Sequence, residues 1–157
     1  ALQGSLSNLA GGVLILLLKP FRVGDYIITA GAEGTVMSID IFYTRIATTD
    51  NKVVVIPNGT ISNSNVTNTT KQDERMLVLE FTVSLDANIE EVKTEIMKLI
   101  ESNERILHEM NRCVVVDKLT PVNIKMQAKA WTKSEDYWDV KYLLLEQISI
   151  VLQGFRG

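Results

Sequence analysis

The sequence has few of the side chains that most often carry chemistry. Its 157 residues include one cysteine, Cys113, and one histidine, His108. A single cysteine cannot form an internal disulfide bond, which fits a reducing compartment. Because Cys113 falls in an apolar strand pattern, we expect it to be buried and inert. His108 falls near a helix end, where a solvated histidine is the ordinary case. We therefore expect no enzymatic activity, no metal site and no cofactor.

The sequence also lacks an excess of charge of either sign. It carries 16 Lys and Arg against 19 Asp and Glu, a formal net charge of −3. Residues 1–75 hold six basic and six acidic side chains, and residues 76–157 hold ten and thirteen. Neither half has the basic excess that is typical of a nucleic-acid-binding domain. The hydrophobic content of 46% is enough for a sizeable core in one domain or two small ones.

No apolar run is long enough to cross a bilayer, which needs about 20 residues. The run Val13 to Leu18 ends a segment whose first half is rich in small residues. Interior glycines weaken a soluble helix, whereas small residues let the helices of a membrane bundle approach closely. We therefore interpret residues 1–18 as the end of a membrane helix, with a soluble helix packed on its own domain as the alternative. Gly4, Gly11 and Gly12 are candidate hinge or close-packing positions in it.

The helix is expected to stop at Pro20, which has no backbone N–H and clashes with the preceding turn. Proline also biases the residue before it, Lys19, toward an extended backbone. Lys19 and Arg22 place two positive charges just after the apolar run. Such charges suit a junction between membrane and cytoplasm, where anionic lipids attract them.

Residues 19–70 have the pattern of short strands joined by tight turns. Asp50-Asn51 is a hairpin turn signal between two β-rich segments. The segment Lys52 to Ile56 is almost continuously β-branched, as in a strand buried on both faces. Pro57, Asn58 and Gly59 follow it as a closing turn. Four or five such strands in about 40 residues predict a small β-barrel.

Residues 71–157 follow the order strand, helix, strand, strand, helix. The preceding segment, 62–73, is polar and marks the boundary between the two domains, although its Thr and Val residues could form an edge strand. Asn88 can cap a helix whose apolar periodicity extends to Leu107, and Ser134 can cap a last helix over about residues 135–153. The fold class is α+β, with a ferredoxin-like βαββα domain whose final strand would begin at residues 154–157.

Three segments, taken in order, resemble the MscS-type small-conductance mechanosensitive channels. The segment GSLSNLAGGVLILLLKPFRVGDYI resembles the end of the pore helix and the entry strand of that family. The segment GTVMSIDIFYTRIATTDNKVVVIPNGTI resembles the Sm-like β-domain, with its Ile-Pro-Asn-Gly closing turn. The βαββα part is similar in order and length to the family's α/β domain. The resemblance covers essentially the whole chain.

The resemblance implies a homoheptamer in the inner membrane of a bacterial or archaeal cell, with this portion mostly cytoplasmic. Residues 1–18 are then the cytoplasmic half of the pore helix, residues 19–70 form a ring, and residues 71–157 form a vestibule with side openings. Membrane tension opens a pore of low selectivity and releases ions and small osmolytes on hypo-osmotic shock. The other membrane helices and the final strand are expected outside this sequence, so this polypeptide alone should not form a gated pore.

Asn8 is a polar residue on an otherwise small and apolar helix. We expect its amide to hydrogen-bond the turn formed by Pro57, Asn58 and Gly59, coupling the pore helix to the β-domain; an amide exposed to water is the alternative. Two other functions stay open. A ring-forming Sm-like RNA-binding protein would need a basic, aromatic-lined face, and a ferredoxin-like small-molecule sensor would show a ligand-dependent thermal shift.

Overall fold

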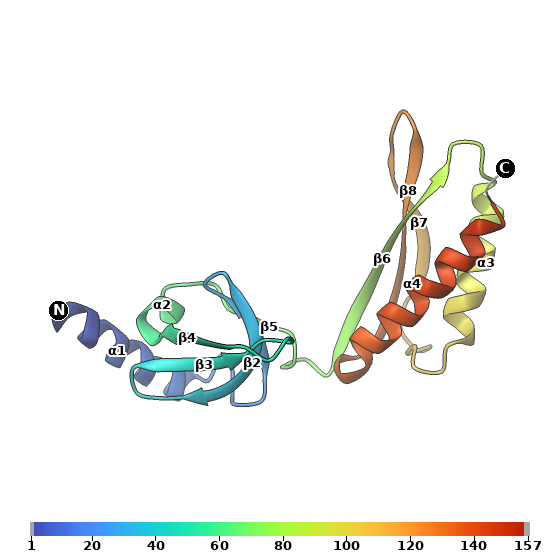
Figure 1. The fold of residues 1–157 in the computed structure, drawn as a ribbon. Coiled ribbons are helices and arrows are strands. Elements are labelled where there is room, and N and C mark those ends of the chain that lie inside the picture. The colour runs from blue at the N-terminus through green and yellow to red at the C-terminus, as the bar shows by residue number, and fades with distance from the viewer. Residues whose placement is uncertain (1, 156–157) are drawn as a thin grey trace. The chain divides into compact units, whose positions relative to one another are not determined.

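The structure, a computed structural model that describes residues 2–155, consists of two compact units (Figure 1). The first, here called the β unit, comprises Ala1–Gln72, and the second, the α/β unit, comprises Asp73–Gly157. The boundary falls two residues beyond the one expected from the polar segment. Ala1, in the expected pore helix, and Arg156 and Gly157, where the final strand is expected to begin, lie outside the described residues.

Helix α1, Leu2–Leu18, opens the β unit and runs without interruption through Gly11 and Gly12. It ends at Lys19, whose backbone is left-handed with φ of 49°. The expectation of an extended Lys19 is therefore wrong. The left-handed turn lets the Lys19 N–H donate to the Ile15 carbonyl at 2.9 Å, which supplies a partner for a terminal carbonyl just before Pro20 stops the helix.

The β unit contains a five-stranded antiparallel sheet in the order β4-β3-β2-β1-β5. A register shift in β2 between Val36 and Ser38 is a β-bulge, which bends the strand. A short helix, α2, follows β4 directly. The bounds are β1 Tyr26–Thr29, β2 Ala32–Ile39, β3 Tyr43–Ala47, β4 Val53–Pro57, α2 Asn58–Ser62 and β5 Thr67–Asn68.

Two expectations for the β4 region are corrected by the structure. Strand β4 is not buried on both faces, because Val53 and Val55 are 54% and 48% exposed while Ile56 is buried. The strand lies at the edge of the sheet, so only its alternate residues face the core. Pro57, Asn58 and Gly59 do not form an isolated turn either, since Pro57 ends β4 and Asn58 and Gly59 begin α2.

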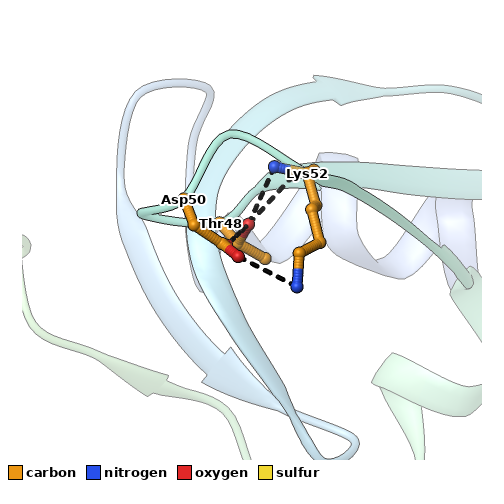
Figure 2. A network of polar contacts seen from close by, with 3 residues as sticks. All are labelled: Thr48, Asp50 and Lys52. Atoms are coloured by element: carbon orange, nitrogen blue, oxygen red, sulfur yellow. Dashed lines mark hydrogen bonds and ion pairs between the residues drawn. The ribbon is translucent and has the colours of Figure 1, made fainter.

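The expected turn at Asp50-Asn51 is confirmed, and polar contacts fix it (Figure 2). The Thr48 hydroxyl donates to Asp50 Oδ1 at 2.6 Å, and the Lys52 N–H donates to the Thr48 hydroxyl at 2.9 Å. Lys52 Nζ also lies 2.9 Å from Asp50 Oδ2. The hydrogen bond from Thr48, followed by that from Lys52, lowers the pKa of the Asp50 carboxyl.

The α/β unit has a three-stranded antiparallel sheet in the order β6-β8-β7, with α3 and α4 packed beside each other against it (Figure 1). This is the order of a ferredoxin-like split βαβ fold, as expected. Alternate residues of β6 and β8, among them Leu77, Leu79, Met126 and Ala128, face the helices and are buried. The bounds are β6 Glu74–Ser84, α3 Ile89–Ser102, β7 Cys113–Leu119, β8 Asn123–Lys133, a 3-10 turn Ser134–Asp136 and α4 Tyr137–Gln153.

Local details of the α/β unit confirm one expectation and correct three. Asn88 caps α3, because its Oδ1 accepts the Glu91 N–H at 3.2 Å. Helix α3 ends at Ser102 and does not reach Leu107, whose N–H instead donates to the Trp131 carbonyl at 2.8 Å. Ser134 begins a 3-10 turn, so α4 starts only at Tyr137. Cys113 is half-buried, not buried, at the start of β7.

Candidate functional site

Helix α1 lies against the β unit through its glycines. Gly11 and Gly12 are buried, and the backbones of residues 41 and 58 approach them closely. A Cβ atom on Gly11 would lie 2.5 Å from the Asn58 carbonyl oxygen. A Cβ on Gly12 would overlap the Ile41 carbonyl oxygen. Because these neighbours are backbone atoms, no larger residue fits without a shift of one segment against the other.

The hydrogen bond expected for Asn8 is present. Asn8 Oδ1 accepts the Gly59 N–H at 3.0 Å. Gly59 lies in the first turn of α2, where backbone N–H groups have no partner within the helix, and the N-cap residue Pro57 makes no side-chain cap hydrogen bond. Asn8 thus caps α2 from a different helix. A Cβ on Gly59 would lie 2.6 Å from Ser7 Oγ, so glycine is required on this side of the contact too.

Asn58 is the polar centre of this contact and is fully buried. Thr44 Oγ1 donates to Asn58 Oδ1 at 2.7 Å, and Asn58 Nδ2 donates to the Asp40 carbonyl at 2.8 Å. The Asn58 backbone N–H donates to the Phe42 carbonyl at 2.9 Å. These bonds join α2 to strand β3 and to the connection between β2 and β3. A buried polar side chain needs such partners, since an unpaired one costs about 1–3 kcal/mol.

The structure brings only part of the predicted set together. Asn8, Gly11, Gly12, Asn58 and Gly59 meet in one contact, here called the α1–α2 junction, and Pro57 stands next to it as the N-cap of α2. Sequence reasoning missed Thr44 and the Asp40 carbonyl. The available signal was the spacing on β3: Thr44 lies two residues before the buried Ile46. Residues two apart on a strand share a face, so the Thr44 hydroxyl is placed on the inward face.

The other predicted positions lie outside the junction. A Cβ on Gly4 would have nothing within 4 Å, so this glycine is not packed against the described residues. Lys19 and Arg22 are exposed, and the Arg22 backbone N–H donates to Asp25 Oδ2 at 3.0 Å. The face of α1 turned away from the junction is apolar and open, with Leu6 66% and Leu17 73% exposed.

Nothing in residues 2–155 forms a recognisable metal site, since no three His, Cys, Asp or Glu side chains gather closely enough to share an ion. His108 is exposed, and its Nε2 lies 3.3 Å from the Asn103 carbonyl oxygen. Of the helices described, none has the length and apolar character required to cross a membrane.

An apolar helix docked on a small β unit is followed along this chain by a ferredoxin-like unit. Two family models match the chain in this order. The model "Mechanosensitive ion channel, beta-domain" matches residues 4–71, and the model "Mechanosensitive ion channel MscS, C-terminal" matches residues 77–153. The chain belongs to the MscS family of mechanosensitive channels.

Individual relatives agree with this assignment. The chain is 36% identical over 154 residues to a small-conductance mechanosensitive channel of Edwardsiella ictaluri, covering 98% of this chain and 54% of that protein. It is 38% identical over 148 residues to an uncharacterized MscS family protein of Synechocystis, covering 94% and 50%. The crystal structure of Helicobacter pylori MscS in the closed state matches with a TM-score of 0.90 and 29% identity, covering 99% of this chain and 62% of that one.

The chain spans about half the length of the curated relatives that it matches. These relatives are channels or members of a channel family, and none of the three is described as an enzyme. The matches favour neither the RNA-binding ring nor the small-molecule sensor.

Proposed function

We propose that the protein is a subunit of a tension-gated channel of low selectivity, which releases ions and small osmolytes on hypo-osmotic shock and is not an enzyme. In this proposal α1 is the cytoplasmic half of the pore helix. The β unit contributes to a ring beneath it, and the α/β unit contributes to the wall of a vestibule. The protein acts in the inner membrane of a bacterial or archaeal cell, with most of this portion in the cytoplasm.

The observation that carries the proposal is the contrast between the two faces of α1. Its glycine face is held against α2 by contacts that leave no space for a side chain. Its other face exposes Leu6, Val13 and Leu17. Exposed apolar surface costs roughly 25 cal/mol per Å² and is normally covered by a partner or by lipid. Neighbouring copies of α1 around a pore would cover it, which supports a homo-oligomer, in this family a homoheptamer.

The α1–α2 junction supports a coupling role for Asn8. Movement of α1 away from α2 would break the hydrogen bond between Asn8 and Gly59. It would also separate Gly11 and Gly12 from the backbone atoms of residues 58 and 41. The junction therefore favours joint movement of α1 and the β unit. Gly4 is the better hinge candidate, because it alone of the three helix glycines has no close neighbour in the described chain. Lys19 and Arg22 would meet anionic lipid headgroups at the base of the helix.

The direct test is pressure-clamp recording from the full-length protein in liposomes. We expect currents that appear with membrane tension and are carried by both cations and anions, and a heptameric mass in detergent by native mass spectrometry. Protection of a channel-deficient bacterial strain from hypo-osmotic shock would agree with the recording. Absence of current up to the lytic tension, with the protein verified in the membrane, would overturn the proposal.

The coupling role has its own test in the same recordings. Asn8→Ala should change the tension midpoint or the decay of current under sustained tension. Asn65→Ala is the matched control, because Asn65 is exposed and its side chain makes no hydrogen bond with the described residues. If both variants gate like the parent channel, Asn8 does not couple helix to β unit.

A further inference from the structure

Asn68 forms a second polar centre in the β unit, with partners that differ from those of the α1–α2 junction. It lies on β5, opposite Ile27 of β1, and is half-buried. Its Nδ2 donates to the Pro20 carbonyl at 3.2 Å and to Asp25 Oδ2 at 2.9 Å. Its Oδ1 accepts the N–H groups of Thr70 at 3.0 Å and Lys71 at 2.9 Å. Two donated and two accepted bonds use the full capacity of a primary amide.

The Nδ2 group and the Oδ1 atom of Asn68 bind two segments that are far apart in the sequence. Pro20 is the second residue after the end of α1. Lys71 is the last residue but one of the β unit, immediately before the α/β unit. Asn68 therefore joins the exit of α1 to the exit of the β unit through one side chain. The side-chain bond to Pro20 bridges 48 residues of sequence.

Neighbouring bonds reinforce both sides. The Thr69 N–H donates to the Tyr26 carbonyl at 3.0 Å, and the Tyr26 N–H donates to Thr70 Oγ1 at 3.0 Å. Asp25 Oδ2, which Asn68 contacts, also accepts the Arg22 N–H. The chain from Pro20 to Tyr26 and the chain from Asn68 to Lys71 thus form one hydrogen-bonded bracket, here called the exit bracket.

We propose that Asn68 is a positioning residue that transmits displacement of the base of α1 to residues 69–72, and through them to the α/β unit. This inference rests on the proposed channel function and adds a second mechanical link to the one at Asn8. Asn8 lies ten residues before Leu18, the last residue of α1, which is about 15 Å along the helix axis at 1.5 Å per residue. A tilt of α1 about the junction would therefore move Pro20 relative to the sheet and load the bond from Asn68.

Asn68→Asp separates this role from a purely structural one. An aspartate keeps the volume and the acceptor oxygen that Thr70 and Lys71 use. It replaces the donor group by an oxygen facing the Asp25 carboxylate and the Pro20 carbonyl, so the α1 side of the bracket is repelled. The second substitution Asp25→Asn supplies an amide that can donate to the new carboxylate and accept the Arg22 N–H. The pair of substitutions therefore exchanges the two groups and keeps the contact between positions 68 and 25, while the bond to the Pro20 carbonyl stays broken.

The experiment records full-length channels in liposomes beside a reference channel in the same patch. We expect Asn68→Asp to change the tension midpoint relative to that reference, or to change the rate of current decay by about twofold or more. Adding Asp25→Asn should restore the part of the parent behaviour that depends on the contact between positions 68 and 25, because the bond to the Pro20 carbonyl is absent in both variants. Asn65→Asp makes the same charge change three residues away on an exposed side chain and should gate like the parent. Thermal unfolding of each purified variant is measured in parallel.

The outcomes separate the two proposals. Parent channels without tension-activated current would refute the channel function itself. Parent channels with current, and an Asn68→Asp variant that unfolds at lower temperature but gates normally, would show a structural role and overturn the inference. A gating change that Asp25→Asn does not reverse even in part also counts against it, since the contact between positions 68 and 25 then plays no role in the effect. If Asn68→Asp yields no folded channel, Asp25→Ala carries the test with the same readouts.

Discussion

The β unit and the α/β unit are each stabilised by a different kind of internal contact. In the described residues, the core of the α/β unit contains sixteen buried hydrophobic side chains, and that of the β unit contains seven. The β unit instead relies on buried or half-buried amides with several partners each, Asn58 and Asn68, and on glycines that admit backbone contact.

This difference has a mechanical consequence. Apolar packing is non-directional, but a close-packed core has low compressibility and resists small changes of form. A hydrogen bond weakens steeply with angle and distance, and a glycine contact leaves no gap to absorb a shift. The β unit is therefore the part of the chain suited to relay movement of α1, and the α/β unit is the part suited to keep its form.

The largest effect should come from the apolar core of the α/β unit. Leu144→Ala removes a fully buried side chain and should destabilise that unit by about 2–5 kcal/mol. Leu143, its neighbour on α4, is 46% exposed, so Leu143→Ala should have little effect. Chemical unfolding followed by hydrogen exchange should show the loss confined to residues 73–157. A similar loss of protection in the β unit would mean that the two units do not unfold separately.

The next largest effect tests the glycine contacts. Gly12→Ala places a methyl group against the Ile41 carbonyl and should destabilise the β unit by about 1–3 kcal/mol. Gly4→Ala meets no neighbouring atom and should strengthen α1 by about 0.5–1 kcal/mol, because alanine is the better helix former. Denaturation midpoints of the two variants in detergent should therefore move in opposite directions. Equal shifts would contradict close packing at Gly12.

A smaller change in stability is expected when two buried threonines, one in each unit, are replaced. Thr44 donates to Asn58 in the β unit, whereas the hydroxyl of Thr132 in the α/β unit has no hydrogen-bond partner among residues 2–155. Thr44→Val should cost about 1–2 kcal/mol, because the buried side-chain oxygen Asn58 Oδ1 loses the hydrogen bond that Thr44 donates. Thr132→Val should be neutral or stabilising, because it removes an unpaired hydroxyl from an apolar surrounding. If both variants lose stability equally, satisfied polar groups do not distinguish the units.

The same contrast explains what the sequence could predict. The α/β unit follows from period-2 and helical apolar patterns, and the alternate apolar residues of β6 and β8, such as Leu77 and Met126, are indeed buried. The contacts of the β unit depend on backbone groups, which a sequence pattern does not display. Thus a bond from Asn8 to residues 57–59 could be expected from residue type, but Gly59 as its partner, the partners of Asn58 and the whole of the exit bracket could not. The exposure of Val53 and Val55 was missed because β-branched residues favour strands whether or not both faces are covered.

The smallest effect concerns pH and the hairpin of the β unit. Hydrogen bonds from Thr48 and Lys52 lower the pKa of Asp50 below its ordinary value of 3.8 in the folded state. The ionised carboxylate therefore stabilises the hairpin fully above the unfolded pKa, and this stabilisation is lost as the pH falls through the folded pKa. Asp50→Asn should remove this part of the acid sensitivity, measured as the difference between variant and parent unfolding midpoints at pH 7 and at about pH 3. Because Thr48 is the larger cause, Thr48→Val should remove more of the difference than Lys52→Met does. The reverse order would assign the effect to the ion pair, which is solvent-exposed and should fade as salt is added.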